Sequence, residues 1–210
     1  MTTDWVAWHD PYADPGSPLS RRLEAVQRHI GAWLDETAPR DVRVLSVCAG
    51  DGRDLLGVLD ARADAGRVAA TLVEIVPLLA DRARARAASS RLTGIEVRCA
   101  DAGTLESYAE CPLADLVLLC GVLGNIGDRD VGAVIGQLPG FCAADARVIW
   151  TRSRRRPDLT PTIREWFSDS GFRELAFDAP DDVLTSVGVH QLARAPEPAT
   201  RNTRLFTFVR

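Results

Sequence analysis

A short glycine-rich loop stands between a predicted buried strand and a predicted helix. Residues 42–47 are mostly apolar, and helical spacing resumes with Leu55, Leu56 and Leu59. Residues 49–52 between them read AGDG, which leaves the backbone nearly bare. Such a loop is either a tight turn or a place where a ligand lies against the backbone at a helix start. The residues that follow the next strands favour the ligand.

Acidic or small residues end or follow the next three predicted strands. Glu74 ends the second strand, where a carboxylate can accept hydrogen bonds from both hydroxyl groups of a ribose. Asp101 follows the third strand and could accept a hydrogen bond from an adenine amino group. Cys120 and Gly121 end the fourth, and their small size lets a ligand lie over the backbone. The simpler alternatives are a solvated strand end for Glu74 and a turn or helix cap for Asp101.

Apolar runs alternate with helical patterns along most of the chain. The first four predicted strands are nearly continuous apolar runs, typical of strands buried on both faces of a parallel sheet. The alternation predicts an α/β fold, a doubly wound Rossmann-like sheet with helices on both faces. Strands are expected at 42–47, 68–74, 95–99, 115–120 and 146–151, and helices at 19–34, 53–60, 77–90, 130–138 and 160–170.

The C-terminal part of the chain has a different pattern. Residues 172–179 and 204–210 are strand-like, and no convincing helix separates them. Residues 185–193 are also extended in character, while residues 196–202 are typical of a loop. We therefore expect a final antiparallel strand pair beside an otherwise parallel sheet.

Length, charge and composition bound the class of protein. The 210 residues predict one domain, with residues 41–210 as its core and residues 1–40 as an N-terminal lid or helical segment packed on it. The net charge of −4 disfavours nucleic acid and membrane surfaces as partners. All 25 basic residues are arginine, which excludes Schiff-base lysine chemistry and a P-loop. Five cysteines without a CxxC pair, and no signal-peptide pattern, predict a reducing cytoplasm.

Taken in order, the glycine loop, the two acids and the small pair resemble the class I S-adenosylmethionine-dependent methyltransferases over about residues 42–151. The resemblance implies a seven-stranded sheet, mostly parallel with an antiparallel last strand, and S-adenosylmethionine as methyl donor. It also implies the donor contacts: Ala49, Gly50, Asp51 and Gly52 for the amino-acid part, Glu74 for the ribose, Ile75 against the adenine, Asp101 and Ala102 at the adenine edge, and Cys120 and Gly121 beneath the methionine portion.

The chain departs from the family pattern at the start of the loop. Ser46 and Cys48 stand where the family commonly has an acidic residue and a first glycine. The ammonium group of the donor would then need another acceptor. Asp51, Asp54 or the Cys120 carbonyl could supply it.

Candidates for a general base are scarce, because the chain has three histidines. His190 could face the site or be a structural residue of the core. His9 lies in an aromatic, proline-containing stretch with Trp8 and Tyr12, which could border the site as a lid or simply anchor the N-terminus. A substrate oxygen usually needs such a base, whereas a neutral amine or a thiolate needs none.

Polar residues beyond the fourth and fifth strands are candidate substrate contacts. Asn125 could touch donor or substrate, or only shape a turn. Arg152 could grip a carboxylate or phosphate, which would suit an anionic substrate, or belong to a solvated loop. Asp128 and Asp130 are typical of a helix start, and we expect no metal site.

Two other functional classes remain open from the sequence. A dinucleotide fingerprint needs a third glycine, where this chain has Leu55, so an NAD-dependent oxidoreductase is the weaker alternative. The other is a non-catalytic binding protein on a methyltransferase fold. The signatures of base-amino and protein-arginine methyltransferases are missing, which leaves a small molecule as the expected substrate. The sequence gives no indication of oligomeric state.

Overall fold

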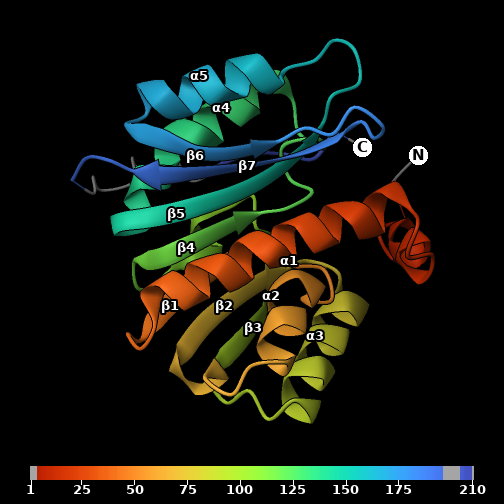
Figure 1. Cartoon of the computed structure of the whole chain (residues 1–210), viewed down its shortest axis with the longest axis vertical. Coiled ribbons are helices and arrows are strands. Elements are labelled where there is room, and N and C mark those ends of the chain that lie inside the picture. Colours follow the sequence, from red (N-terminus) through yellow and green to blue (C-terminus); the bar gives the residue numbers. More distant parts are fainter. Residues whose placement is uncertain (1–3, 196–203, 210) are drawn as a thin grey trace.

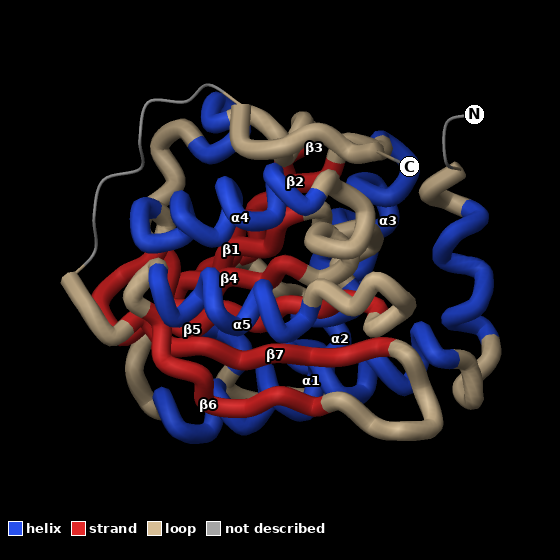
Figure 2. The backbone as a smooth tube through the Cα atoms, turned by 90° about the horizontal axis from the view of Figure 1, so that it is seen from above, coloured by secondary structure: helices blue, strands red, loops and turns tan. Residues whose placement is uncertain are grey.

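A seven-stranded sheet with helices on both faces organises the chain (Figures 1 and 2). The computed structural model describes residues 4–195 and 204–209. The strands are β1 Val42–Val47, β2 Val68–Glu74, β3 Ile95–Cys99, β4 Ala114–Leu119, β5 Cys142–Ser153, β6 Phe172–Asp178 and β7 Thr185–Leu192. The helices are α1 Pro18–Thr37, α2 Arg53–Asp60, α3 Pro77–Ser89, α4 Asp128–Gln137 and α5 Thr160–Asp169, with short 3-10 turns η1 Ala7–Ala13, η2 Ala65–Arg67, η3 Leu105–Tyr108 and η4 Leu138–Gly140.

The strand order is β3-β2-β1-β4-β5-β7-β6. Strand β7 runs antiparallel to both of its neighbours, and the pairs among β1 to β5 are parallel. The order reverses between β1 and β4, and ligands of doubly wound sheets bind at the carboxyl ends of the strands beside such a switch point. The predicted doubly wound sheet is therefore confirmed.

Each face of the sheet has its own apolar core. Helices α1, α2 and α3 cover one face, where Leu116 and Leu118 of β4 point. Helices α4 and α5 cover the other, where Val117 and Leu119 point. This alternation explains why β4 is apolar throughout, since both of its faces are buried. None of the helices in the described ranges is both long and apolar enough to span a bilayer.

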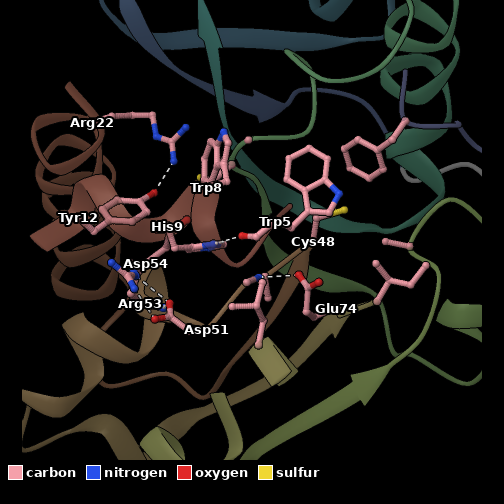
Figure 3. Close-up of a pocket in the computed structure, with 18 of the residues that line it drawn as sticks. Trp5, Trp8, His9, Tyr12, Arg22, Cys48, Asp51, Arg53, Asp54 and Glu74 are labelled. Carbon is pink, nitrogen blue, oxygen red and sulfur yellow. Dashed lines mark hydrogen bonds and ion pairs between the residues drawn. The ribbon is translucent and has the colours of Figure 1, made fainter. Parts of the chain in front are cut away.

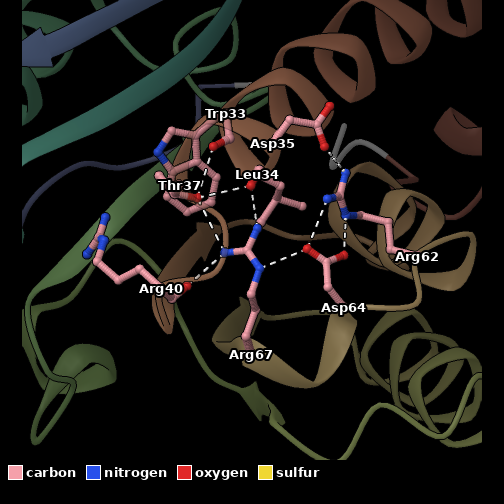
Figure 4. Close-up of polar contacts among 8 residues, drawn as sticks. All are labelled: Trp33, Leu34, Asp35, Thr37, Arg40, Arg62, Asp64 and Arg67. Carbon is pink, nitrogen blue, oxygen red and sulfur yellow. Dashed lines mark hydrogen bonds and ion pairs between the residues drawn. The ribbon is translucent and has the colours of Figure 1, made fainter.

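A buried arginine fastens the end of α1 to the loop before β2 (Figure 4). The Arg67 side chain donates hydrogen bonds to the backbone carbonyls of Leu34 and Arg40, and it forms an ion pair with Asp64. Arg62 forms an ion pair with the same carboxylate. The last carbonyls of a helix have no partner within the helix, so a cation there satisfies them and offsets the helix dipole. The network fixes one end of the helix whose other end borders the pocket described below.

The prediction for the C-terminal strands was partly wrong. The antiparallel pair is β6 with β7, so residues 185–192 form the partner strand. Within 204–209 the structure has only isolated bridges, from Arg204 to Thr104 and from Phe208 to Ile126. Residues 196–202, expected to form a loop, and Arg210 lie outside the described residues. Several extended segments compete for one sheet edge, and sequence pattern alone does not rank them.

Strand β5 is longer than its apolar core predicts, because it begins at Cys142 rather than at residue 146. The added residues include Asp145, which adopts a positive φ of 60°, and the register between β4 and β5 shifts beside it. Backbone pairing with β4 therefore extends the strand through residues of low strand propensity.

The β5–β7 pair depends on a glycine in a crowded position. Trp150 of β5 is fully buried and pairs in register with Gly188 of β7. A Cβ atom at Gly188 would lie 2.2 Å from the Trp150 ring. The ring stacks on Phe167 of α5, at a centroid distance of 5.8 Å, so the pair also holds α5 on the sheet.

Candidate active site

One pocket lies at the carboxyl ends of β1, β2 and β4, beside the switch point (Figure 3). About 760 Å³ of space free of protein atoms lies between its walls, the open mouth included. It brings together most of the residues expected from the sequence: Trp8, His9, Tyr12, Ala49, Gly50, Asp51, Asp54, Glu74, Ile75, Asp101, Ala102, Cys120 and Gly121.

The glycine loop has left-handed backbone at three positions. Cys48, Gly50 and Gly52 have φ values of 55°, 58° and 73°. Cys48 thus takes a conformation that usually requires glycine, at the position where the family pattern has one. A Cβ atom at Gly52 would lie 2.7 Å from Leu56 and 3.0 Å from Leu72. Gly52 therefore serves the packing of α2 and does not line the pocket, where we had expected it to contact the donor.

The Glu74 carboxylate joins the end of β2 to the glycine loop. One oxygen accepts a hydrogen bond from the Gly50 N–H and the other from the Val76 N–H, both at 2.8 Å. The residue is buried at the pocket wall, so it is not the solvated strand end that was the simpler alternative. Each carboxylate oxygen keeps acceptor capacity beyond these bonds. Glu74 can thus shape the loop and bind a ligand hydroxyl at the same time.

Asp101 shapes a turn and also lines the pocket. Its Oδ1 accepts from the Gly103 N–H at 2.8 Å, and its Oδ2 lies 3.2 Å from Arg204 of the C-terminal segment. The turn expected as the simpler alternative is therefore present, at a residue of the pocket wall. Beyond it, Ile75 is 52% exposed at the mouth, which leaves an apolar surface for a flat ligand group to cover.

The end of β4 carries a thiol beside a carboxylate. The Cys120 thiol lies near the carboxyl group of Asp54, the second residue of α2, and the two groups affect each other's pKa. Burial raises the pKa of Asp54, and the nearby charge of Arg22 partly offsets this. Burial and the Asp54 charge hold the pKa of the Cys120 thiol well above its usual value. Cys120 therefore stays protonated and can line a site without reacting.

The N-terminal segment forms an aromatic wall over the loop. His9 donates its Nδ1–H to the Trp5 carbonyl at 2.7 Å, so a neutral ring presents Nε2 as an acceptor. That Nε2 would lie 2.7 Å from a Cβ atom at Gly50. Trp5 also packs on Phe208, at a centroid distance of 5.3 Å, so both terminal segments meet above the pocket.

Sequence reasoning missed several lining residues: Trp5, Arg22, Cys48 as a wall residue, Arg53, Leu79 and Phe208. The spacing of Trp5, Trp8 and Tyr12 could have indicated an aromatic face. No local sequence signal marks Phe208, which lies near the opposite end of the chain.

Arg53, one of these missed residues, forms a bidentate ion pair with Asp51. The ion pair lowers the pKa of the Asp51 carboxyl despite its burial.

Three expected site residues lie away from the pocket. Asn125 donates to the Gly121 carbonyl at 2.6 Å and shapes the turn after β4. Arg152 donates to the Leu123 carbonyl and lies 3.2 Å from Asp128. His190 is buried in β7, stacked on Phe167 at a centroid distance of 4.3 Å. Among the described residues, no group of three or more His, Cys, Asp or Glu side chains is arranged to hold a metal ion.

We expect His190 to make stability depend on pH. Burial lowers its pKa to about 4, against about 6.5 in the unfolded chain, so the unfolded state binds the proton more tightly. The stability of the folded state is therefore unaffected by this group above pH 6.5, and it falls as the pH is lowered from 6.5 towards 4. Between pH 7 and pH 5 the loss amounts to about 2 kcal/mol. Urea unfolding at both pH values measures it.

The matched variant for this test is His190→Gln. Its amide oxygen can still accept from the Trp150 indole N–H, which donates to His190 at 3.1 Å, but it does not titrate. Between pH 7 and pH 5, the free energy of unfolding of this variant is expected to fall by about 2 kcal/mol less than that of the unmodified protein. Equal losses in both proteins would contradict a neutral buried His190.

Comparisons with known proteins identify the fold. No protein-family model matches the chain, and no curated protein matches it by sequence. An O-methyltransferase family protein from Burkholderia thailandensis matches with a TM-score of 0.67 at 18% identity, over 91% of this chain and 60% of that protein's length. Magnesium protoporphyrin IX methyltransferase from Synechocystis PCC 6803 was solved with bound S-adenosylmethionine. It matches with a TM-score of 0.67 at 17% identity, over 90% of this chain and 91% of that protein's chain.

A pre-rRNA processing protein, fibrillarin from Methanococcus jannaschii, matches with a TM-score of 0.58 at 16% identity, over 73% of this chain and 67% of that one. These proteins share the fold while their names point to different substrates. The predicted resemblance is thus confirmed at the level of architecture: this chain has the fold of the class I S-adenosylmethionine-dependent methyltransferases.

Proposed function

We propose that this protein is an S-adenosylmethionine-dependent methyltransferase that methylates a small-molecule nucleophile. The observation that carries the proposal is the convergence of Gly50, Glu74, Asp101 and Gly121 on one pocket at the switch point. They come from four different strand ends. Bare backbone, a carboxylate and a second acid are the groups that a nucleoside with a charged tail requires.

The pocket residues fit the donor. Gly50 and Gly121 both have positive φ and present backbone without a side chain. Glu74 keeps acceptor capacity for a ribose diol, and Asp101 lies at the same wall. The exposed Ile75 supplies an apolar surface for a base.

When bound, S-adenosylmethionine supplies a methyl group already activated by its sulfonium. The chain's residues then have to bind the donor and the acceptor, orient them towards each other and exclude water. Positioning of the reactants alone can lower the activation barrier by roughly 7–11 kcal/mol. Trp5, Trp8 and Phe208 supply the apolar cover. His9 Nε2 is the best-placed general base for an acceptor that must lose a proton. His190, buried away from the pocket, is not proposed for that role.

A small molecule is the proposed acceptor. The two terminal segments narrow the mouth of the pocket, and the net charge of −4 opposes a nucleic-acid partner. Arg152 no longer supports an anionic substrate, because its guanidinium is bound to Leu123 and Asp128 outside the pocket.

Calorimetric titration with S-adenosylmethionine, and separately with NAD, tests the proposal. We expect saturable one-to-one binding of S-adenosylmethionine and none of NAD. Binding of NAD alone would favour the oxidoreductase alternative. Binding of neither would leave a methyltransferase fold without its cofactor and would overturn the proposal. Donor binding without turnover of any small nucleophile would instead favour the non-catalytic alternative.

A further inference from the structure

One end of the pocket carries a cation and an anion close to each other. Arg22, from α1, and Asp54, from α2, both line it. Figure 3 shows Arg22 and Tyr12 on the side of His9 away from Glu74. The two charges are near enough for Arg22 to lower the pKa of Asp54 against the effect of burial. The other end of the pocket is lined by two acids, Glu74 and Asp101.

Most other charged groups of the pocket already have partners of opposite charge. Arg53 is bound to Asp51, and Arg204 reaches Asp101. Arg22, by contrast, donates to the Tyr12 hydroxyl and lies over the Trp8 ring at 5.3 Å. Within the described part of the chain, neither Arg22 nor Asp54 forms an ion pair.

A partly buried charge that lacks a partner of opposite charge is stabilised by a ligand that supplies one. A ligand with a carboxylate and an ammonium on the same carbon would supply both opposite charges at once. Tyr12 adds a hydrogen-bond donor, since burial raises its pKa to about 12 and the phenol keeps its proton.

We propose that Arg22 and Asp54 form a subsite for the α-amino-acid group of the donor, with the guanidinium binding the carboxylate and Asp54 binding the ammonium. This inference rests on the proposed function. It gives the site the ammonium acceptor that Ser46 does not provide. It also assigns a role to Arg22, which lies outside the stretch that carries the family resemblance. NAD has no such group, so the subsite would also select between the two cofactors.

The test compares two ligands by calorimetry on the full chain. S-adenosylhomocysteine carries the amino-acid group, and 5′-methylthioadenosine is the same nucleoside thioether without it. The unmodified protein is expected to bind the first much more tightly. Arg22→Met should lower the affinity for S-adenosylhomocysteine about 10- to 100-fold, as expected for a charged hydrogen bond, and leave that for methylthioadenosine nearly unchanged. Asp54→Asn should act in the same direction.

Arg21→Met is the matched control, because Arg21 neighbours Arg22 on α1 but pairs with the exposed Asp182 at 2.8 Å. It should change neither affinity. Retained methylthioadenosine binding shows that each variant is folded. If Arg22→Met weakens both ligands equally, or neither, the inference is overturned while the donor site stands. If the unmodified protein binds neither ligand, the proposed function fails, and this inference fails with it.

Discussion

Glu74→Ala is expected to weaken S-adenosylmethionine binding more than about 100-fold, and Glu74→Gln about 10- to 100-fold. In the proposed complex the carboxylate accepts from the ribose hydroxyls, and hydrogen bonds to a charged group contribute about 1.5–3 kcal/mol each. Glutamine keeps one acceptor oxygen but loses the charge, so the affinity of Glu74→Gln should lie between those of the unmodified protein and Glu74→Ala. Calorimetric titration of the three proteins measures the order.

The same substitutions affect the loop before any ligand binds. Alanine leaves the Gly50 and Val76 N–H groups without the acceptor they have now, so Glu74→Ala should also lower the free energy of unfolding by about 1–3 kcal/mol. Thermal unfolding separates this loss from the binding effect. Glu96→Gln is the control, since Glu96 pairs with Arg98 on β3 away from the pocket. Unchanged donor affinity in Glu74→Gln would contradict the assigned role.

Gly188→Ala is expected to destabilise the protein by about 2–4 kcal/mol. The new methyl group would lie 2.2 Å from the Trp150 ring, and that ring cannot retreat because it is fully buried against Phe167. Overpacking of a core costs about 1–3 kcal/mol, and more where the neighbour cannot move. Chemical denaturation measures the loss.

A double-mutant cycle identifies the clash as the cause. Trp150→Phe removes part of the ring that a Cβ atom at position 188 would meet, so Gly188→Ala should cost at least about 1 kcal/mol less in that background. Gly31→Ala is the control for glycine replacement itself. Gly31 lies within α1, where no atom is within 4 Å of an added Cβ, so this change should stabilise by up to about 1 kcal/mol. Strict additivity of the two core changes would contradict the packing argument.

Much of the donor side of the pocket was predictable because its determinants are local. Apolar runs and helical spacing fixed the β and α alternation, and parallel strands place all their carboxyl ends at one edge of the sheet. Glu74, Asp101 and Cys120 each stand at such an end, so their convergence followed from sequence position. The glycines of the loop were visible as residue types, although only packing separates Gly50, in the pocket wall, from Gly52, beneath α2.

Only the tertiary structure decided which distant segments complete the site. Trp5 packs against Phe208, which lies near the opposite end of the chain, and no periodicity in either segment predicts that contact. His190 lies on an extended segment whose two faces look alike in sequence, and packing turned it towards Phe167 and away from the pocket. Arg22 lines the pocket because α1 packs against α2 and β7, which are distant from it in the sequence. Local pattern determines elements and their ends, whereas the free energy of packing selects partners far apart in the chain.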